Sequence, residues 1–346
     1  MPLNPSLETV LKKAKEQEKK YGWLYAAWSY EQALHFMSET SSFTADTWQR
    51  IGFCYERASR QAEDLEEFNR FRQLAVEAYM TAAKLFEKEE SLDNQGKSAY
   101  CCTSAEYIRS WLASSPSEKA KMLDECLTFG NKALAAFKKN GDDLSYGKTC
   151  SDLLLCLFER LLLGSNDNEE NIVQQGVYYW NEAIPALSKI DDKSELIRAY
   201  SLASLLSWYV ANIIVEREEE RKEMADLSMN YSDKAVALSR EVENPYDIAL
   251  SQWPAALCAL LFVGNTESSL AHAREMLEQG NIAKDNYLRG VASFTLAFVN
   301  DWMVPKEGNP DKKKTRCEET FRYAQDAERY LTLVAQDFFI AETYLY

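Results

Sequence analysis

The stretch WQRIGFCY at residues 48–55 decides the fold. It spaces Trp48, Gly52 and Tyr55 by four and then three residues, so that all three lie on one face of a helix. Two antiparallel helices approach closely only where small residues face the partner, and bulky aromatic side chains then fill the space beside the crossing. The stretch therefore predicts the first helix of a closely packed helical hairpin.

A matching second helix follows in the sequence. Ala75, Tyr79 and Ala82 stand at i, i+4 and i+7, which places two small residues and one aromatic residue on a single face. Ala75 and Ala82 would let the two backbones approach, and Tyr79 would fill the gap beside them. The intervening segment Ser59–Arg70 is rich in charge, and we expect a solvated extension at the hairpin tip.

The second-helix spacing recurs along the chain. It appears at Ala26, Tyr30 and Ala33, at Cys126, Gly130 and Ala133, and at Gly176, Trp180 and Ala183, with weaker copies at Ser228, Ser232 and Ala235, and at Thr320, Ala324 and Ala327. Neither helix of such a unit can bury its apolar stripe alone, so neighbouring hairpins must stack. We therefore assign packing roles to Gly176, Trp180 and Ala183 as well as to the residues of the second hairpin.

These repeats predict an all-α fold, a right-handed α-α superhelix that forms one solenoid domain over residues 1–346. Scarce glycine (12) and proline (8) agree with it, because an all-β fold needs many tight turns. We expect about seven hairpins, or roughly 14–15 helices, with units longer than the standard repeat of about 34 residues. The predicted hairpins span residues 6–39, 44–90, 94–139, 144–190, 194–242, 246–281 and 286–335, and residues 336–346 begin a further helix.

The signatures at residues 48–55 and at Ala75, Tyr79 and Ala82 resemble the two helices of the tetratricopeptide repeat (TPR). The array is similar to degenerate, long-repeat members of this superfamily. Ala133-Leu134 followed by Asn140-Gly141-Asp142 looks like the long repeats of bacterial and archaeal signalling ATPases and peptide sensors. A more distant likeness is to the soluble attachment proteins of membrane fusion. The resemblance implies a scaffold or a sensor arm.

The resemblance also implies a binding face, because TPR proteins hold ligands on the groove face of their first helices. The candidate binding residues on this face are Gln49, Phe53, Glu56, Arg57, Cys102, Glu106 and Arg109. Chaperone-binding members clamp a terminal carboxylate with Lys and Asn at these positions, and that clamp is absent here. An acidic chaperone tail is therefore not an expected partner.

Charge and cysteine usage narrow the partners further. The net charge of −15 disfavours nucleic acid and anionic membrane surfaces, and favours a basic, apolar or amphipathic protein or peptide. No apolar run approaches the roughly 20 residues that span a bilayer. The eight cysteines form no C-x-x-C pair, so we interpret most of them as small buried residues in a reducing compartment. We expect a cytoplasmic protein.

The residues that catalysis or cofactor binding would need are missing. The sequence has two histidines, His35 and His272, far apart, and we interpret them as surface or groove polar residues. It has no G-x-G-x-x-G and no G-x4-G-K-[ST] to cradle phosphates. We expect no enzymatic activity, no cofactor and no metal ion.

Two functions stay open from the sequence. The first is a scaffold or adaptor that binds a peptide or helical segment in a concave groove. The alternative is a sensor arm of a larger signalling or transcription-regulating protein, which would bind a small effector or peptide. Residues 336–346 (QDFFIAETYLY) resemble the opening of a first helix without a polar cap. This predicts either that the chain is a fragment of a longer protein, or that a partner or a second copy covers its apolar end.

Overall fold

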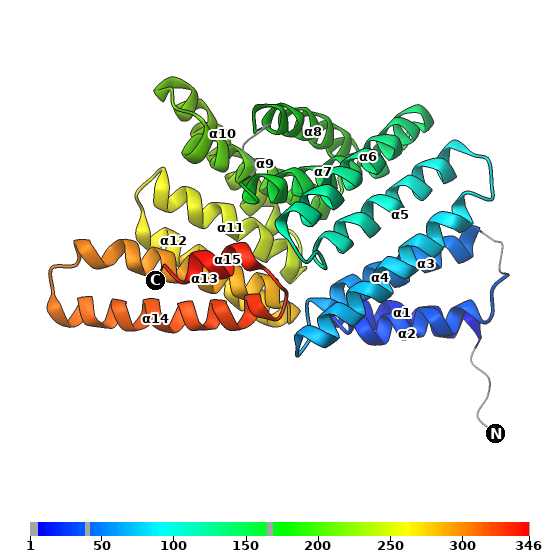
Figure 1. The fold of residues 1–346 in the computed structure, drawn as a ribbon, viewed down its shortest axis with the longest axis horizontal. Coiled ribbons are helices and arrows are strands. Elements are labelled where there is room, and N and C mark those ends of the chain that lie inside the picture. The colour runs from blue at the N-terminus through cyan, green and yellow to red at the C-terminus, as the bar shows by residue number, and fades with distance from the viewer. Residues whose placement is uncertain (1–5, 39–41, 165–168, 346) are drawn as a thin grey trace. The chain divides into compact units, whose positions relative to one another are not determined.

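A computed structural model describes residues 6–38, 42–164 and 169–345 of the chain, without the side chains of residues 337 and 338. Regular structure in these ranges is helical throughout (Figure 1). Helices follow one another in antiparallel pairs, and each predicted hairpin corresponds to one such pair. The predicted all-α helical-repeat architecture is confirmed.

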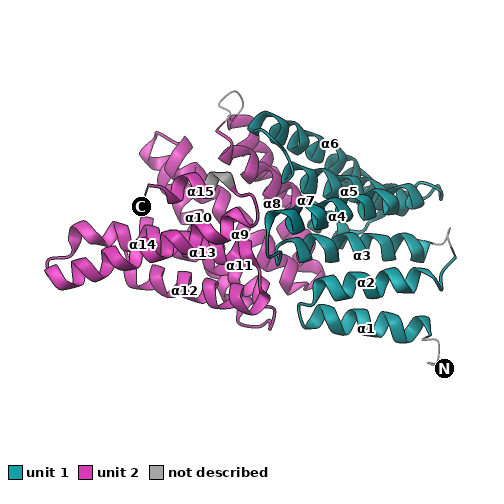
Figure 2. Ribbon diagram, turned by 60° about the horizontal axis from the view of Figure 1, so that its bottom comes forward, with its two compact units in different colours: residues 1–149 teal, residues 150–346 magenta. Residues whose placement is uncertain are grey.

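The chain divides into two compact units, Met1–Thr149 and Cys150–Tyr346 (Figure 2). The boundary falls inside helix α7 (Asp143–Leu162). Each unit is described by itself below, and the continuous solenoid over residues 1–346 stays a prediction.

In the first unit each helix packs against the next one along the chain, from α1 to α6. Its helices are α1 (Leu7–Lys19), α2 (Trp23–Leu34), α3 (Ser42–Ser59), α4 (Leu65–Phe86), α5 (Leu92–Ser110) and α6 (Pro116–Asn140). Side chains cap several helix starts: the oxygens of Asp64, Ser91 and Ser115 each accept a backbone N–H three residues ahead. Gly141 ends α6 in the left-handed conformation, with φ of 74°, which glycine adopts without strain.

The crossing of α3 and α4 has the predicted packing. A Cβ atom on Gly52 would lie 2.7 Å from Cδ2 of Tyr79, so only glycine allows the helices this close. Ala75 and Ala82 are fully buried on the facing side. Tyr55 is buried and stacks on Phe71, with ring centroids 6.2 Å apart. Trp48 is half-buried and packs against the same core.

The hairpin of α5 and α6 also packs a glycine against an aromatic ring, at positions that the sequence pattern did not predict. A Cβ atom on Gly96 of α5 would lie 2.5 Å from Cε1 of Phe137 on α6. The predicted triplet Cys126, Gly130 and Ala133 is buried, but the aromatic side chain at the crossing is Phe137, four residues after Ala133. The pattern of a small residue followed four positions later by an aromatic residue is therefore formed by Ala133 and Phe137.

The solvated tip predicted for Ser59–Arg70 is wrong in part. Arg60, Ala62 and Phe68 are buried, and only the short charged stretch 63–66 is exposed throughout. The inserted residues lengthen α3 and α4, and their ends pack on the end of α5. There the Phe68 ring lies 6.4 Å from the Trp111 ring. The apolar face of α4 continues through the insertion, so one side of the extension is buried and the other is exposed.

The second unit continues the helical pairs. Its helices after α7 are α8 (Glu169–Ile190), α9 (Lys193–Tyr209), α10 (Glu218–Ser239), α11 (Pro245–Leu261), α12 (Thr266–Ala283), α13 (Asn286–Met303), α14 (Pro310–Thr332) and α15 (Asp337–Thr343). From α8 to α15 each helix contacts the next, and α9, α11, α13 and α15 also contact one another in sequence. Trp180 and Ala183 of α8 are buried, and a Cβ atom on Gly176 would clash with Leu206 of α9. Gly176 thus lies at a close contact between α8 and α9.

The further helix predicted within residues 336–346 is α15. Its Phe339 is 4% exposed and lies against three aromatic rings. Ring-centroid distances are 5.7 Å to Trp253, 6.4 Å to Tyr287 and 5.6 Å to Phe294. The expectation that this segment needs a partner for cover is therefore wrong for Phe339, because α11 and α13 of the same chain cover it. Self-association stays a prediction.

Substituting Gly52 by valine tests the close approach of α3 and α4. The new side chain must displace the Tyr79 ring, so we expect a loss of about 1–3 kcal/mol in the free energy of unfolding. Gly308→Val is the matched control, because a Cβ atom at Gly308 meets nothing within 4 Å. Urea unfolding followed by circular dichroism measures both. Equal stability of the two variants would contradict the packing described here.

Candidate functional site

The central residue of the predicted binding face is Phe53, on α3. Its ring meets the ring of Trp23 edge-on, with centroids 5.6 Å apart. The guanidinium carbons of Arg50 and Arg57 lie 4.5 and 5.1 Å from the centroid of the Phe53 ring. Phe53 itself is only half-buried. The structure thus places a half-buried aromatic ring between two guanidinium groups, within reach of solvent.

The charged neighbours of Phe53 differ in the ion pairs and hydrogen bonds that they form. Arg50 forms a two-point ion pair with Glu18 of α1, which holds its guanidinium in place. Glu56 accepts a hydrogen bond from Nη2 of Arg60 at 3.2 Å. Gln49, Glu56 and Arg57 are all half-buried, as expected for residues on the same face as Phe53. We call Gln49, Phe53, Glu56 and Arg57 the Phe53 surface.

The predicted residues on α5 form a separate group. Glu106 is 5% exposed and forms an ion pair with Arg109. Burial raises the pKa of Glu106, and the positive charge of Arg109 opposes that shift. Burial also raises the pKa of the half-buried Cys102, which keeps its thiol protonated. Since Glu106 is buried and paired within its own helix, this group is less suited to contact a ligand than the Phe53 surface.

A cluster of cations around Trp111 was not predicted. The side-chain charge centres of Arg60, Arg72 and Lys119 lie 5.5, 4.2 and 5.8 Å from the Trp111 ring. Arg72 and Trp111 are buried, so these stacked cations join the ends of α3 and α4, and α6, to the end of α5. The four residues lie on different segments between residues 60 and 119 with no regular spacing, so the sequence did not reveal the cluster.

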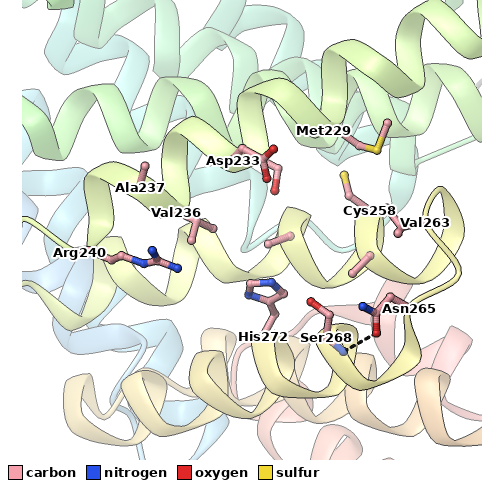
Figure 3. Close-up of a pocket in the computed structure, with 13 residues that line it drawn as sticks. Met229, Asp233, Val236, Ala237, Arg240, Cys258, Val263, Asn265, Ser268 and His272 are labelled. Atoms are coloured by element: carbon pink, nitrogen blue, oxygen red, sulfur yellow. Dashed lines mark hydrogen bonds between the residues drawn. The ribbon is translucent and has the colours of Figure 1, made fainter.

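A pocket of about 420 Å³ opens between α10, α11 and α12 in the second unit (Figure 3). Asp233 and Val236 line it from α10, Arg240 from the C-cap of α10, Cys258 from α11 and His272 from α12. Burial raises the pKa of Cys258, so its thiol is a neutral part of the lining. Sequence analysis expected His272 on the surface or in a groove, but it did not associate it with Asp233 and Arg240. Only the stacking of the three helices brings these residues together.

The neighbours of His272 determine the tautomer and the pKa of its ring. Its Nδ1 lies 2.6 Å from Oε1 of Gln252, whose side chain is 2% exposed. An amide oxygen only accepts hydrogen bonds, so Nδ1 carries a proton and Nε2 of the neutral ring is an acceptor. Burial lowers the pKa of His272 below 6.5, and Arg240 lowers it further, while Glu275 and Asp233 raise it. His35, in contrast, lies exposed at the end of α2.

The other sequence-based interpretations have mixed outcomes. All eight cysteines are free thiols, and six of them are buried, as expected for most of them. Cys317 is exposed, because it lies on the outer face of α14. Within the described ranges, no helix is both long enough and apolar enough to cross a membrane.

Comparison with known proteins places the fold but not the family. No protein-family model matches the chain, and no curated protein sequence is similar to it. Among solved structures, the Rap conjugation gene regulator of plasmid pLS20, in complex with the Phr* peptide, matches with a TM-score of 0.56 and 14% identity. The match covers 94% of this chain and 76% of the regulator.

A second solved structure is a circular tandem repeat protein, with 9% identity and a TM-score of 0.34 over 97% of this chain and 79% of that protein. This likeness is too weak to carry an argument. The likeness to the Rap regulator supports the helical-repeat fold. Membership of the TPR superfamily stays a prediction.

The pKa of His272 can be measured directly. His35→Gln leaves a single imidazole, and we expect its NMR titration midpoint below 6.5 because burial disfavours the charged ring. Between the folded and unfolded pKa values the unfolded state binds more protons. Stability should therefore fall as the pH drops from about 6.5 through this window, and His272→Gln should remove that dependence. A midpoint at or above 6.5 would contradict the burial of the ring.

Proposed function

We propose that the protein is a non-enzymatic scaffold that binds a peptide or helical segment of a partner protein at the Phe53 surface. The observation that carries the proposal is the half-buried Phe53 ring between the guanidinium groups of Arg50 and Arg57. Aromatic and arginine side chains dominate the energy of protein interfaces. Because Glu18 already holds Arg50, the Arg50 side chain loses little conformational entropy when a partner stacks against this surface.

The chemistry of the surface indicates an amphipathic partner. An apolar side chain would contact the ring of Phe53, while Gln49 and Arg57 would bond to the partner's backbone or polar groups. Glu56 is engaged by Arg60, so it offers its remaining acceptor sites rather than an unpaired charge. The net charge of −15 disfavours strongly acidic peptides, in agreement with the missing carboxylate clamp.

The fold likeness supports the same proposal. The Rap regulator, which shares the helical-repeat fold, was solved with a peptide bound. Stacked helical hairpins expose the side chains of several helices side by side, and such repeat surfaces commonly serve as binding sites. Neither the fold likeness nor the Phe53 surface favours the alternative function, a sensor arm that binds a small effector or peptide, over the scaffold.

A peptide-display selection on the purified protein tests the proposal. We expect selected peptides to bind with an affinity that Phe53→Ala lowers about tenfold or more, the range of an interface hot spot. Phe321→Ala is the matched control, because Phe321 is 60% exposed and lies on α14 of the second unit. Fluorescence anisotropy measures binding, and circular dichroism checks that both variants fold. Selected peptides that bind Phe53→Ala as tightly as the parent would sink the proposal.

A further inference from the structure

Two side chains of opposite charge line the pocket between α10, α11 and α12 and do not pair with other side chains in the described part of the chain. Asp233 and Arg240 line the pocket and are both exposed. In the described part of the chain neither side chain forms a hydrogen bond or an ion pair. They stand seven residues apart on one face of α10, which corresponds to about 10.5 Å along the helix axis. This separation is too great for them to pair directly with each other.

A third polar group reaches the pocket from the opposite helix. Figure 3 shows the ring of His272 on α12 facing the side of α10 that carries Asp233 and Arg240. Its other nitrogen is held at 2.6 Å by the buried amide oxygen of Gln252. The ring is therefore fixed in orientation, with the Nε2 acceptor left for a ligand.

Small apolar side chains lie between the charged groups, and Ser232, Ser268 and Asn265 also line the pocket. Val236 and Ala237 separate Asp233 from Arg240 along α10, and Ala255, Cys258 and Ala259 line the pocket from α11. Small side chains on α11 leave room for a ligand backbone with side chains of similar size. A ligand that fits has one positive end, one negative end and a body with few charges.

We propose that this pocket binds a free peptide of about three residues, whose extended length of about 10 Å matches the separation of Asp233 and Arg240. The terminal ammonium group pairs with Asp233 and the terminal carboxylate with Arg240. His272 Nε2 accepts a hydrogen bond from a backbone N–H of the peptide. An internal segment of a protein carries no charged termini, whereas a short free peptide presents both of them at about this distance.

The site is independent of the proposed scaffold function. It lies in the second unit, while the Phe53 surface lies in the first, and it takes a short charged peptide rather than a segment of a partner protein. Such a ligand carries no net charge, so the overall charge of −15 does not oppose its binding. Either proposal can fail without the other.

Titration calorimetry with trialanine tests the proposal, with N-acetyl-trialanine and trialanine amide as capped probes. We expect trialanine to bind the intact protein, and each cap to weaken binding about tenfold, or about 1.4 kcal/mol. The small methyl side chains match the apolar lining. Absence of trialanine binding at millimolar concentration, or equal binding of all three peptides, would overturn the proposal.

Charge-neutralising variants then assign each end of the peptide. With Asp233→Asn, acetylation should cause no further loss, while amidation should still weaken binding; with Arg240→Gln the pattern should reverse. Asp226→Asn and Lys222→Gln are matched controls on the same helix and outside the pocket, and they should bind as the parent does. Caps that weaken binding to all variants equally would place the peptide elsewhere and refute the assignment.

Discussion

The close approach of paired helices at a small residue is the constraint on which the rest of the structure depends. At Gly52, Gly96 and Gly290 a Cβ atom would lie within 2.7 Å of a large side chain on the partner helix. This packing lets each hairpin bury its apolar stripes with few bulky residues. Because successive hairpins must stack to cover the remaining faces, the position of every surface residue follows from these crossings.

Charge is distributed unevenly in this acidic chain. Although the net charge is −15, several arginines lie buried or half-buried against aromatic rings. Arg72 is wholly buried beside Trp111 and Phe68, and Arg57 lies over Phe53. Guanidinium groups are weakly hydrated and stack on aromatic faces, so they are better suited to such positions than lysine. Arg50 and Arg57 lie in this way on the ring of Phe53, the residue at the centre of the proposed binding surface.

Much of the architecture could be predicted from sequence alone. The small-aromatic spacing at residues 48–55 and its copies specify hairpins, because helical periodicity and close packing are local properties. The turn formers between the apolar stretches then predict where each hairpin begins and ends. The crossing at Gly96 and Phe137 was missed because alanine is common in helices, and a spacing alone does not show which of two copies meets the partner.

Only the tertiary structure decided which side chains meet across hairpins. Sequence indicated the face of α3 that carries Phe53, since that face follows from helical geometry. It did not show that Glu18 of another helix holds Arg50, that Phe339 is covered, or that His272 joins Asp233 and Arg240. Those contacts depend on the lengths and crossing angles of helices far apart in the chain, and no local pattern encodes them.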